Sequence, residues 1–311
     1  MIRANRTGGG LQRRAILAGL AASCAARPAW AQDAVVVASK SDTEGALTGA
    51  MIALCLEDLG LPVQRRLGLG PTLIVRSALI SGDVDVYPEY TGNGAFFTGT
   101  EADPVWKQAQ GAYDAIARAD RSRGLIWLRP APANNTWLIA VRGSLARHEH
   151  LASMADFAGA VRRGLILLAA STEFVESPAA LPSFAAAYGF DLPLDRIISL
   201  PGGDTAVTAR AAAQGISGVN AGMVYGTDGA LDALDLTVMS DPKGAQIVYE
   251  VAPVIRAATL ERYPQVRGKL DPVFASLDAA RLRRLNARVT VDGAVAESVA
   301  RTYLRDAGFI G

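Results

Sequence analysis

Residues 35–60 read VVVASKSDTEGALTGAMIALCLEDLG, and this stretch contains the unit that decides the fold. The apolar run at 35–39 predicts a buried strand. Leu47, Met51 and Leu54 then follow at the spacing of one helix face. A strand that passes directly into a helix is typical of an α/β sheet with crossover helices.

The residues that flank this helix predict where it begins and ends. Ser41 and Glu44 match a capping box, with Ser41 as the N-cap and Glu44 at the third helical position. Gly60 is placed to end the helix. Pro71 and Gly82 bound a second helix in the same way, since proline favours the first turn and glycine the C-terminal cap.

The alternation of strands and helices continues and then restarts. A short strand at 84–87 leads into YPEYTGNG at 87–94, and a polar helix is predicted at 101–123. A strand at 136–141 begins a second round, and the region from 249 onward is rich in helix patterns. Because the pattern occurs twice in 311 residues, we expect two similar α/β lobes.

The N-terminal 31 residues have the layout of an export signal. Arginines precede a short apolar run at 15–22, and an Ala-Trp-Ala site ends at Ala31, where we expect cleavage. Arg13 and Arg14 resemble a twin-arginine motif, so ordinary secretion and twin-arginine export both stay open. Cys24 leaves a lipoprotein site open as a further alternative.

Composition limits the classes of partner and the location. The leader holds five of the 31 basic residues and none of the 30 acidic ones, so the chain after Ala31 is mildly acidic. A nucleic-acid partner is therefore not expected. Cys55 would be the one remaining cysteine, which excludes an internal disulfide. No later apolar run reaches bilayer length, so we expect a periplasmic protein.

Groups for catalysis or metal binding are few. The two histidines, His148 and His150, lie in the polar stretch RHEH, which reads as a surface turn without further metal ligands. We expect no cofactor, no metal and no catalysis. An exported enzyme that uses Asp228 or Glu89 with Lys40 in acid–base work stays open as an alternative.

Lys40 stands out among the basic residues, since four of the 31 are lysines. It lies at the end of the first predicted strand, next to a helix N-terminus. Open α/β sheets bind ligands at this place, where an ammonium and free backbone N–H groups meet an anionic group. A solvated surface lysine is the alternative interpretation.

Several aromatic residues occur at predicted strand ends rather than inside apolar runs. Tyr90, Trp137 and Tyr225 lie beside turn residues, and Tyr249 begins the last region. Rings at such positions project into a cleft, where their faces are suited to surround a methylated ammonium. Tyr87, by contrast, is expected to pack into the first lobe.

Five segments together resemble the osmoprotectant (glycine betaine/choline) substrate-binding proteins of ABC importers, in the OsmF-type branch of the quaternary-amine binding family. The segments are VVVASKSDTEGAL, GLGPTLIVRSALISGDVDVYPEYTGNGAFF, NNTWLIAV, YGTDGALDALDL and DPKGAQIVYEVAPVIR. The resemblance implies a type II periplasmic-binding-protein fold, with a ligand cleft between two α/β lobes joined by a two-segment hinge. It places lobe 1 at 32–131 and 241–311, and lobe 2 at 132–240. It also implies a monomeric receptor that delivers a small osmolyte to the transmembrane subunits of a permease.

The resemblance implies a set of ligand-binding residues. Trp137 stands where many relatives have tyrosine, and tryptophan is the stronger cation–π partner. Asn93 stands where close relatives often have threonine. The implied aromatic cage is Tyr90, Trp137, Tyr225 and Tyr249, the implied polar contacts are Lys40 and Asn93, and weaker candidates are Thr91, Ser177 and Asp228.

One departure from the family pattern concerns the ligand carboxylate. Many betaine binders of this type have an arginine shortly after a Glu-Phe pair, whereas this chain has Ser177 or a neighbour there, after Glu173 and Phe174. Loss of a charged hydrogen bond costs about 1.5–3 kcal/mol, or about one to two decades in affinity. We therefore expect weak betaine binding, or another ligand such as a non-methylated amino acid or ectoine-like zwitterion.

Overall fold

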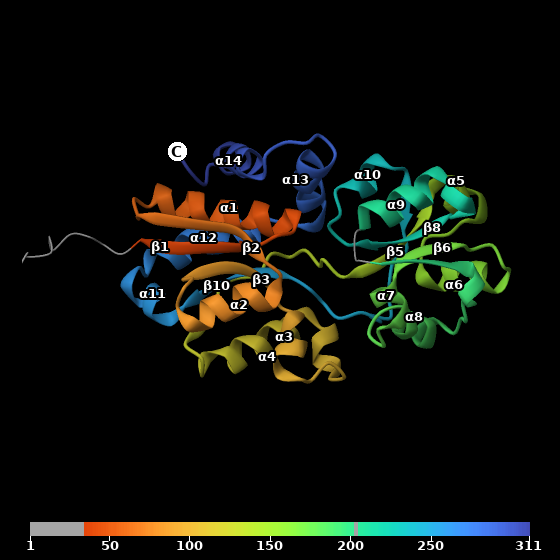
Figure 1. The fold of residues 1–311 in the computed structure, drawn as a ribbon, viewed down its shortest axis with the longest axis horizontal. Coiled ribbons are helices and arrows are strands. Elements are labelled where there is room, and N and C mark those ends of the chain that lie inside the picture. Colours follow the sequence, from red (N-terminus) through yellow and green to blue (C-terminus); the bar gives the residue numbers. More distant parts are fainter. Residues whose placement is uncertain (1–33, 202–204) are drawn as a thin grey trace, which may run out of the picture. The chain divides into compact units, whose positions relative to one another are not determined.

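The computed structural model describes residues 34–201 and 205–311, which form two five-stranded mixed sheets flanked by helices (Figure 1). The predicted leader, its cleavage site and Cys24 lie outside the described residues. Within the described part of the chain, no helix combines the length and apolar character that a membrane span requires. This architecture confirms the predicted class, a type II fold with two α/β lobes.

Each lobe is built from one sheet and the helices packed on it. The first lobe contains β1 (Val35–Lys40), α1 (Thr43–Asp58), β2 (Val63–Gly70), α2 (Thr72–Ser81), β3 (Val86–Tyr90), α3 (Asn93–Thr98), α4 (Ala109–Arg121), β4 (Leu125–Trp127), β10 (Val251–Arg256), α11 (Ala257–Arg262), α12 (Gln265–Ala275), α13 (Ala279–Thr290) and α14 (Ala296–Asp306). The second lobe contains β5 (Trp137–Arg142), α5 (Gly143–Glu149), α6 (Met154–Arg162), β6 (Leu168–Ser171), α7 (Thr172–Glu176), α8 (Leu181–Tyr188), β7 (Ile197–Leu200), α9 (Thr205–Gln214), β8 (Ala221–Tyr225), α10 (Ala230–Ala233) and β9 (Leu236–Val238).

The two sheets share one strand order. The first runs β2-β1-β3-β10-β4 and the second β7-β6-β8-β5-β9. In both, three parallel strands are followed by a strand that runs antiparallel to its two neighbours. That antiparallel strand, β10 or β5, arrives directly after the chain has crossed from the other lobe. As a result, β3 and β8 occupy equivalent places and end at Tyr90 and Tyr225.

Two segments connect the lobes and are hydrogen-bonded to each other. Asn134 and Glu250 form an antiparallel bridge, and the Asn135 N–H donates to the Tyr249 carbonyl at 2.9 Å. The Thr136 hydroxyl donates to the Ile247 carbonyl at 2.7 Å. The predicted hinge of two segments is therefore present, and each segment restrains the other.

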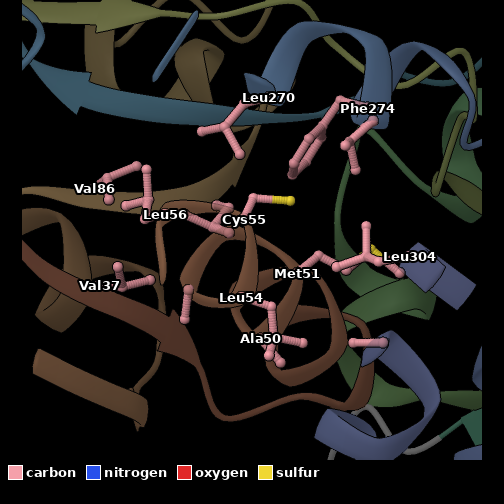
Figure 2. Packing of buried hydrophobic residues seen from close by; sticks show 14 of the residues in the cluster. Val37, Ala50, Met51, Leu54, Cys55, Leu56, Val86, Leu270, Phe274 and Leu304 are labelled. Atoms are coloured by element: carbon pink, nitrogen blue, oxygen red, sulfur yellow. The ribbon is translucent and has the colours of Figure 1, made fainter. Parts of the chain in front are cut away.

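The core of the first lobe surrounds α1, which is apolar on nearly every face. Figure 2 shows Cys55 and Met51 of α1 beneath Phe274 and Leu270, with Leu304 alongside. A helix that is apolar all round must be covered on every side, here by the sheet and by α12, α13 and α14. Burial raises the pKa of the Cys55 thiol to about 12, so this cysteine stays protonated and inert.

Both sheets are covered on their second face as well. In the first lobe, Val75, Leu79 and Trp106 belong to a separate buried cluster on the side of α2 and α4 (Figure 1). In the second lobe, one cluster lies under α6 and α8 and smaller ones under α9 and α10. Tyr87 is fully buried in the first lobe, as predicted.

The helix caps confirm one prediction and correct another. Pro71 is the N-cap of α2 and Gly82 its C-cap with φ of 90°, as expected. For α1, the prediction that Ser41 caps the helix is wrong. Asp42 is the N-cap and accepts from the Gly45 N–H at 2.7 Å, because the Ser41 N–H is held by the Gly70 carbonyl of β2. Glu44 is therefore not part of a capping box.

Element boundaries differ modestly from the predicted ones. The strand expected at 84–87 runs from Val86 to Tyr90, and the one expected at 136–141 is β5. The helix expected at 101–123 is divided into a 3₁₀ turn, Pro104–Lys107, and α4, with Asp103 capping the turn. Tertiary pairing decides such ends, because local propensity varies little across them.

Candidate ligand-binding site

A buried carboxylate, Glu89, organises the first lobe's share of the site. Its Oε1 accepts from Lys40 Nζ at 3.0 Å, from Asn93 Nδ2 at 2.8 Å and from the Tyr90 N–H at 2.7 Å. Its Oε2 accepts from the Tyr87 hydroxyl at 2.8 Å. Glu89 thus brings together three predicted site residues, Lys40, Tyr90 and Asn93. From the sequence, Glu89 was a candidate only for the enzyme alternative.

Lys40 and Tyr90 are in direct contact. The Lys40 ammonium lies 4.0 Å from the centroid of the Tyr90 ring, a cation–π geometry, and both residues are buried. Burial raises the pKa of the Tyr90 phenol well above its usual value, and the neighbouring Glu44 raises it further. The phenol is therefore neutral and acts as a hydrogen-bond donor. One face of the ring is already covered by an ammonium in this arrangement.

The second lobe contributes a pair of rings. Trp137 and Tyr225 lie opposite each other on the adjacent strands β5 and β8, so their rings are nearly parallel, with an interplanar angle of 19° and centroids 6.5 Å apart. Phe174 of α7 meets Trp137 edge-on at 6.1 Å. Burial raises the pKa of Tyr225, and the nearby Trp137 indole opposes that rise. The two rings are half-buried, and the fully buried Phe174 supports Trp137 from the side.

Tyr249 lies in the second connecting segment, close to both lobes. Its N–H donates to Asn134 Oδ1 at 2.8 Å, and its ring packs against Gly92, where an added Cβ would lie 2.7 Å from Tyr249 Cδ1. Glycine is therefore required in YPEYTGNG for this close approach. Burial raises the pKa of Tyr249, with smaller contributions from Tyr225 and Glu173.

The three weaker candidates have local structural roles. Thr91 is fully buried; its hydroxyl donates to the Val248 carbonyl at 3.3 Å and accepts from the Glu250 N–H at 3.1 Å. Asp228 accepts from the Tyr225 N–H at 2.8 Å and so shapes the turn after β8. Ser177 is the C-cap of α7, three residues after Phe174.

Glu44 accepts hydrogen bonds from four parts of the chain. Its partners are uncharged: the Tyr90 hydroxyl at 2.7 Å, Thr227 Oγ1 at 2.5 Å, Asn286 Nδ2 at 2.8 Å and Asn135 Nδ2 at 3.5 Å. We call these five residues the Glu44 network. Burial raises the pKa of Glu44 above its ordinary value of 4.5, although its donors act in the opposite direction.

The raised pKa of Glu44 predicts a pH trend in stability. The folded state holds the proton more tightly than the unfolded state, so the wild-type free energy of unfolding should fall as pH rises from about 4.5 through the folded-state pKa. Glu44→Gln removes the titration, so this variant should gain stability relative to the wild type over that window. The titratable groups next to the Glu44 carboxyl are Asp42 and Tyr90.

Urea unfolding at several values between about pH 3 and pH 8 measures this trend on both sides of the ordinary carboxyl pKa. Glu297→Gln is the control of opposite sign, because hydrogen bonds from Arg65 and Arg301 lower the pKa of Glu297. That variant should lose stability relative to the wild type as pH rises from the lowered pKa of Glu297 to about 4.5, and the difference should stay constant above that value. A stability difference between wild type and Glu44→Gln that does not change with pH would contradict the assignment.

Sequence reasoning missed several residues that position the site. Asn134 and Asn135 lie in NNTWLIAV. Glu89 lies in YPEYTG and Thr227 in YGTDG. The segments that carry the family resemblance therefore contain these residues, but do not show which side chains they bond to. The missed residues are Glu44, Glu89, Asn134, Asn135, Phe174, Thr227 and Asn286.

The fold is of type II, and in each lobe a central strand ends in a tyrosine beside the connecting segments. Together these two features define a solute-binding protein. The chain belongs to the family described as the substrate binding domain of ABC-type glycine betaine transport systems, whose model matches residues 33–306. The predicted family is therefore confirmed.

Individual relatives agree with this assignment. The chain is 52% identical over 284 residues to the glycine betaine-binding protein YehZ of Escherichia coli strain K12, covering 91% of this chain and 93% of that protein. It is 30% identical over 279 residues to a glycine-betaine-binding protein of Pseudomonas aeruginosa, covering 87% and 86% of the two chains. The solved structure of apo YehZ matches with a TM-score of 0.80 over 89% of this chain and 99% of that one. A glycine betaine/carnitine/choline ABC transporter structure, at 21% identity and a TM-score of 0.78, supports the fold alone.

Proposed function

We propose that this protein is an exported receptor that captures a quaternary-ammonium solute of the glycine betaine or choline type and delivers it to the membrane subunits of an ABC importer. The observation that carries the proposal is the stacked pair of Trp137 and Tyr225, at adjacent ends of β5 and β8, which the buried Phe174 of α7 supports edge-on. Ring faces attract a methylated ammonium, which has no N–H to donate. Membership of a glycine betaine-binding family supports the same ligand class.

The anionic end of the ligand would meet Lys40 and Asn93. Each donates one hydrogen bond to Glu89 and retains further N–H donors, since an ammonium has three and a side-chain amide two. Ser177 or a neighbour provides no charge where many betaine binders of this type have an arginine, and this favours weak betaine binding. Glu173 of the same helix places a carboxylate near Tyr225 and Tyr249, where its charge favours the ammonium end of the ligand.

The proposal includes the setting of the receptor. Lobe 1 comprises 32–131 and 241–311 and lobe 2 comprises 132–240; the protein is periplasmic after cleavage near Ala31, and it acts as a monomer without catalytic turnover. The strand order supports a first crossing between β4, which ends at Trp127, and β5, which begins at Trp137, and a return between β9, which ends at Val238, and β10, which begins at Val251.

Calorimetric titration of the purified protein with glycine betaine, choline and proline betaine tests the ligand class. We expect saturable heat from at least one of them. Absence of heat from all three at millimolar concentration would reject the proposal. A fourth titration with proline, which is not methylated, would favour a non-methylated zwitterion if proline binds more tightly than these three. NMR of the bound ligand over hours would reveal any turnover.

Trp137→Ala should weaken glycine betaine binding about 30-fold, because a desolvated cation–π contact contributes about 2 kcal/mol. Trp137→Phe keeps a weaker ring, so its affinity should lie between that of Trp137→Ala and that of the wild type. Phe309→Ala is the matched control, since Phe309 packs against Tyr303 near the C-terminus. Its melting temperature should fall while its affinity stays at the wild-type value. Equal affinity in Trp137→Ala and wild type would remove Trp137 from the cage.

A further inference from the structure

The loop between β8 and α10, residues 226–229 with the sequence GTDG, lies against α13 of the first lobe. Asn286 Nδ2 donates to the Thr227 carbonyl at 2.9 Å, and Arg283 Nε donates to the Gly226 carbonyl at 2.8 Å. A Cβ added to Gly229 would lie 2.2 Å from the Ala287 nitrogen. The loop that follows Tyr225 is thus held at backbone-to-backbone distance by a helix of the other lobe.

Glu44 joins this contact to the first lobe's side of the ligand site. One carboxylate oxygen, Oε2, accepts from Thr227 Oγ1 and Asn286 Nδ2, and the other, Oε1, accepts from the Tyr90 hydroxyl. A carboxylate offers about four acceptor positions, which matches the four donors of the Glu44 network. Glu44 is 5% exposed, so it makes these bonds in a region from which water is largely excluded.

We propose that Glu44 is a positioning residue of the ligand site: it holds the Tyr90 ring through its hydroxyl and, through Thr227, holds the loop that follows Tyr225. This inference rests on the proposed function, since it concerns the same site. A single carboxylate then links the ends of the equivalent strands β3 and β8. When the lobes close, the distance between Tyr90 and Tyr225 is therefore set at the same time, so the two changes are coupled.

Coupling of this kind acts on affinity through the population of the binding-competent state. Apparent affinity falls in proportion to the fraction of molecules that are competent before the ligand arrives. Each hydrogen bond between Glu44 and the second lobe raises that fraction. Two side chains from 132–240 donate to Glu44, Thr227 at 2.5 Å and Asn135 at 3.5 Å. The shorter bond is that of Thr227, so removal of its hydroxyl is the smallest change that cuts the coupling.

Thr227→Val tests the inference, because valine has the same shape and lacks the hydroxyl. We expect glycine betaine, used as the probe in calorimetry, to bind about tenfold more weakly. Small-angle scattering without ligand should give a larger radius of gyration, since fewer molecules are closed. Thr227→Ser restores the hydroxyl and should restore both values.

Thr208→Val is the matched control. Thr208 is a buried threonine of the second lobe whose hydroxyl donates to the Met223 carbonyl within that lobe. This variant should lose thermal stability while its affinity and radius of gyration stay at the wild-type values. If Thr227→Val behaves like Thr208→Val, the inference is overturned. If the wild type binds neither glycine betaine nor choline, the proposed function fails, and the radius of gyration of Thr227→Val alone decides the role of Glu44.

Discussion

Asp120→Ala is expected to lower the free energy of unfolding by about 3–5 kcal/mol, the usual effect of breaking a buried ion pair on one side. Asp120 is fully buried and accepts from both terminal nitrogens of Arg76, at 2.6 and 3.1 Å. It also accepts from the Trp127 indole at 2.9 Å. Alanine would leave a guanidinium and an indole N–H buried without their acceptor.

Urea unfolding of the purified variant measures the loss. Arg76→Met combined with Asp120→Ala should be less destabilised than Asp120→Ala alone, because no uncompensated charge then stays buried. Arg147→Ala breaks the exposed pair with Asp235 and should change stability very little. Equal losses in the single and double variants would show that the charge of Arg76 is not the cause.

Gly229→Ala should weaken glycine betaine binding about 100-fold, the upper range of overpacking costs. Gly229 has φ of −66° and ψ of −24°, a conformation that alanine adopts without strain, so the effect is purely steric. Its Cβ would lie 2.2 Å from Ala287 N and 2.5 Å from Ala287 Cα. These are backbone atoms and have no rotamer by which to move aside, so the contact between loop and helix must open.

Gly268→Ala is the control for this substitution. Gly268 lies within α12, and a Cβ there meets no atom within 4 Å. Its affinity for glycine betaine should match the wild type. Gly229→Ala should also show a larger radius of gyration without ligand. Wild-type affinity in Gly229→Ala would mean that ligand binding does not require the contact between residues 226–229 and α13.

The sequence was informative where structure follows from local pattern. The apolar run at 35–39, the helical spacing of Leu47 and Met51 and the glycine at 82 each correspond to an element that the structure contains. The repeat of the pattern predicted two lobes, and the sheets have the same strand order. These features depend on periodicity and turn chemistry, which a single chain displays openly.

Prediction was less successful where local rules compete with distant partners. Ser41, Asp42 and Glu44 all suit a helix start, and the capping box with Ser41 is a reasonable local solution. The Gly70 carbonyl of β2 takes the Ser41 N–H instead, so Asp42 becomes the cap. This pairing of strands across the sheet has no local signature. The carboxylate of Glu44 bonds to Tyr90, Thr227 and Asn286 rather than to the helix start.

The sequence by itself determined the kinds of element, their order, the two lobes and the family, because periodicity, turn residues and motifs are local. Only the tertiary structure decided which side chains meet at the site. The donors to Glu44 from β3, the β8–α10 loop and α13 lie 46, 183 and 242 positions away along the chain. A buried carboxylate takes whatever donors the packed lobes bring to it, because leaving it without hydrogen bonds costs more than any local preference contributes.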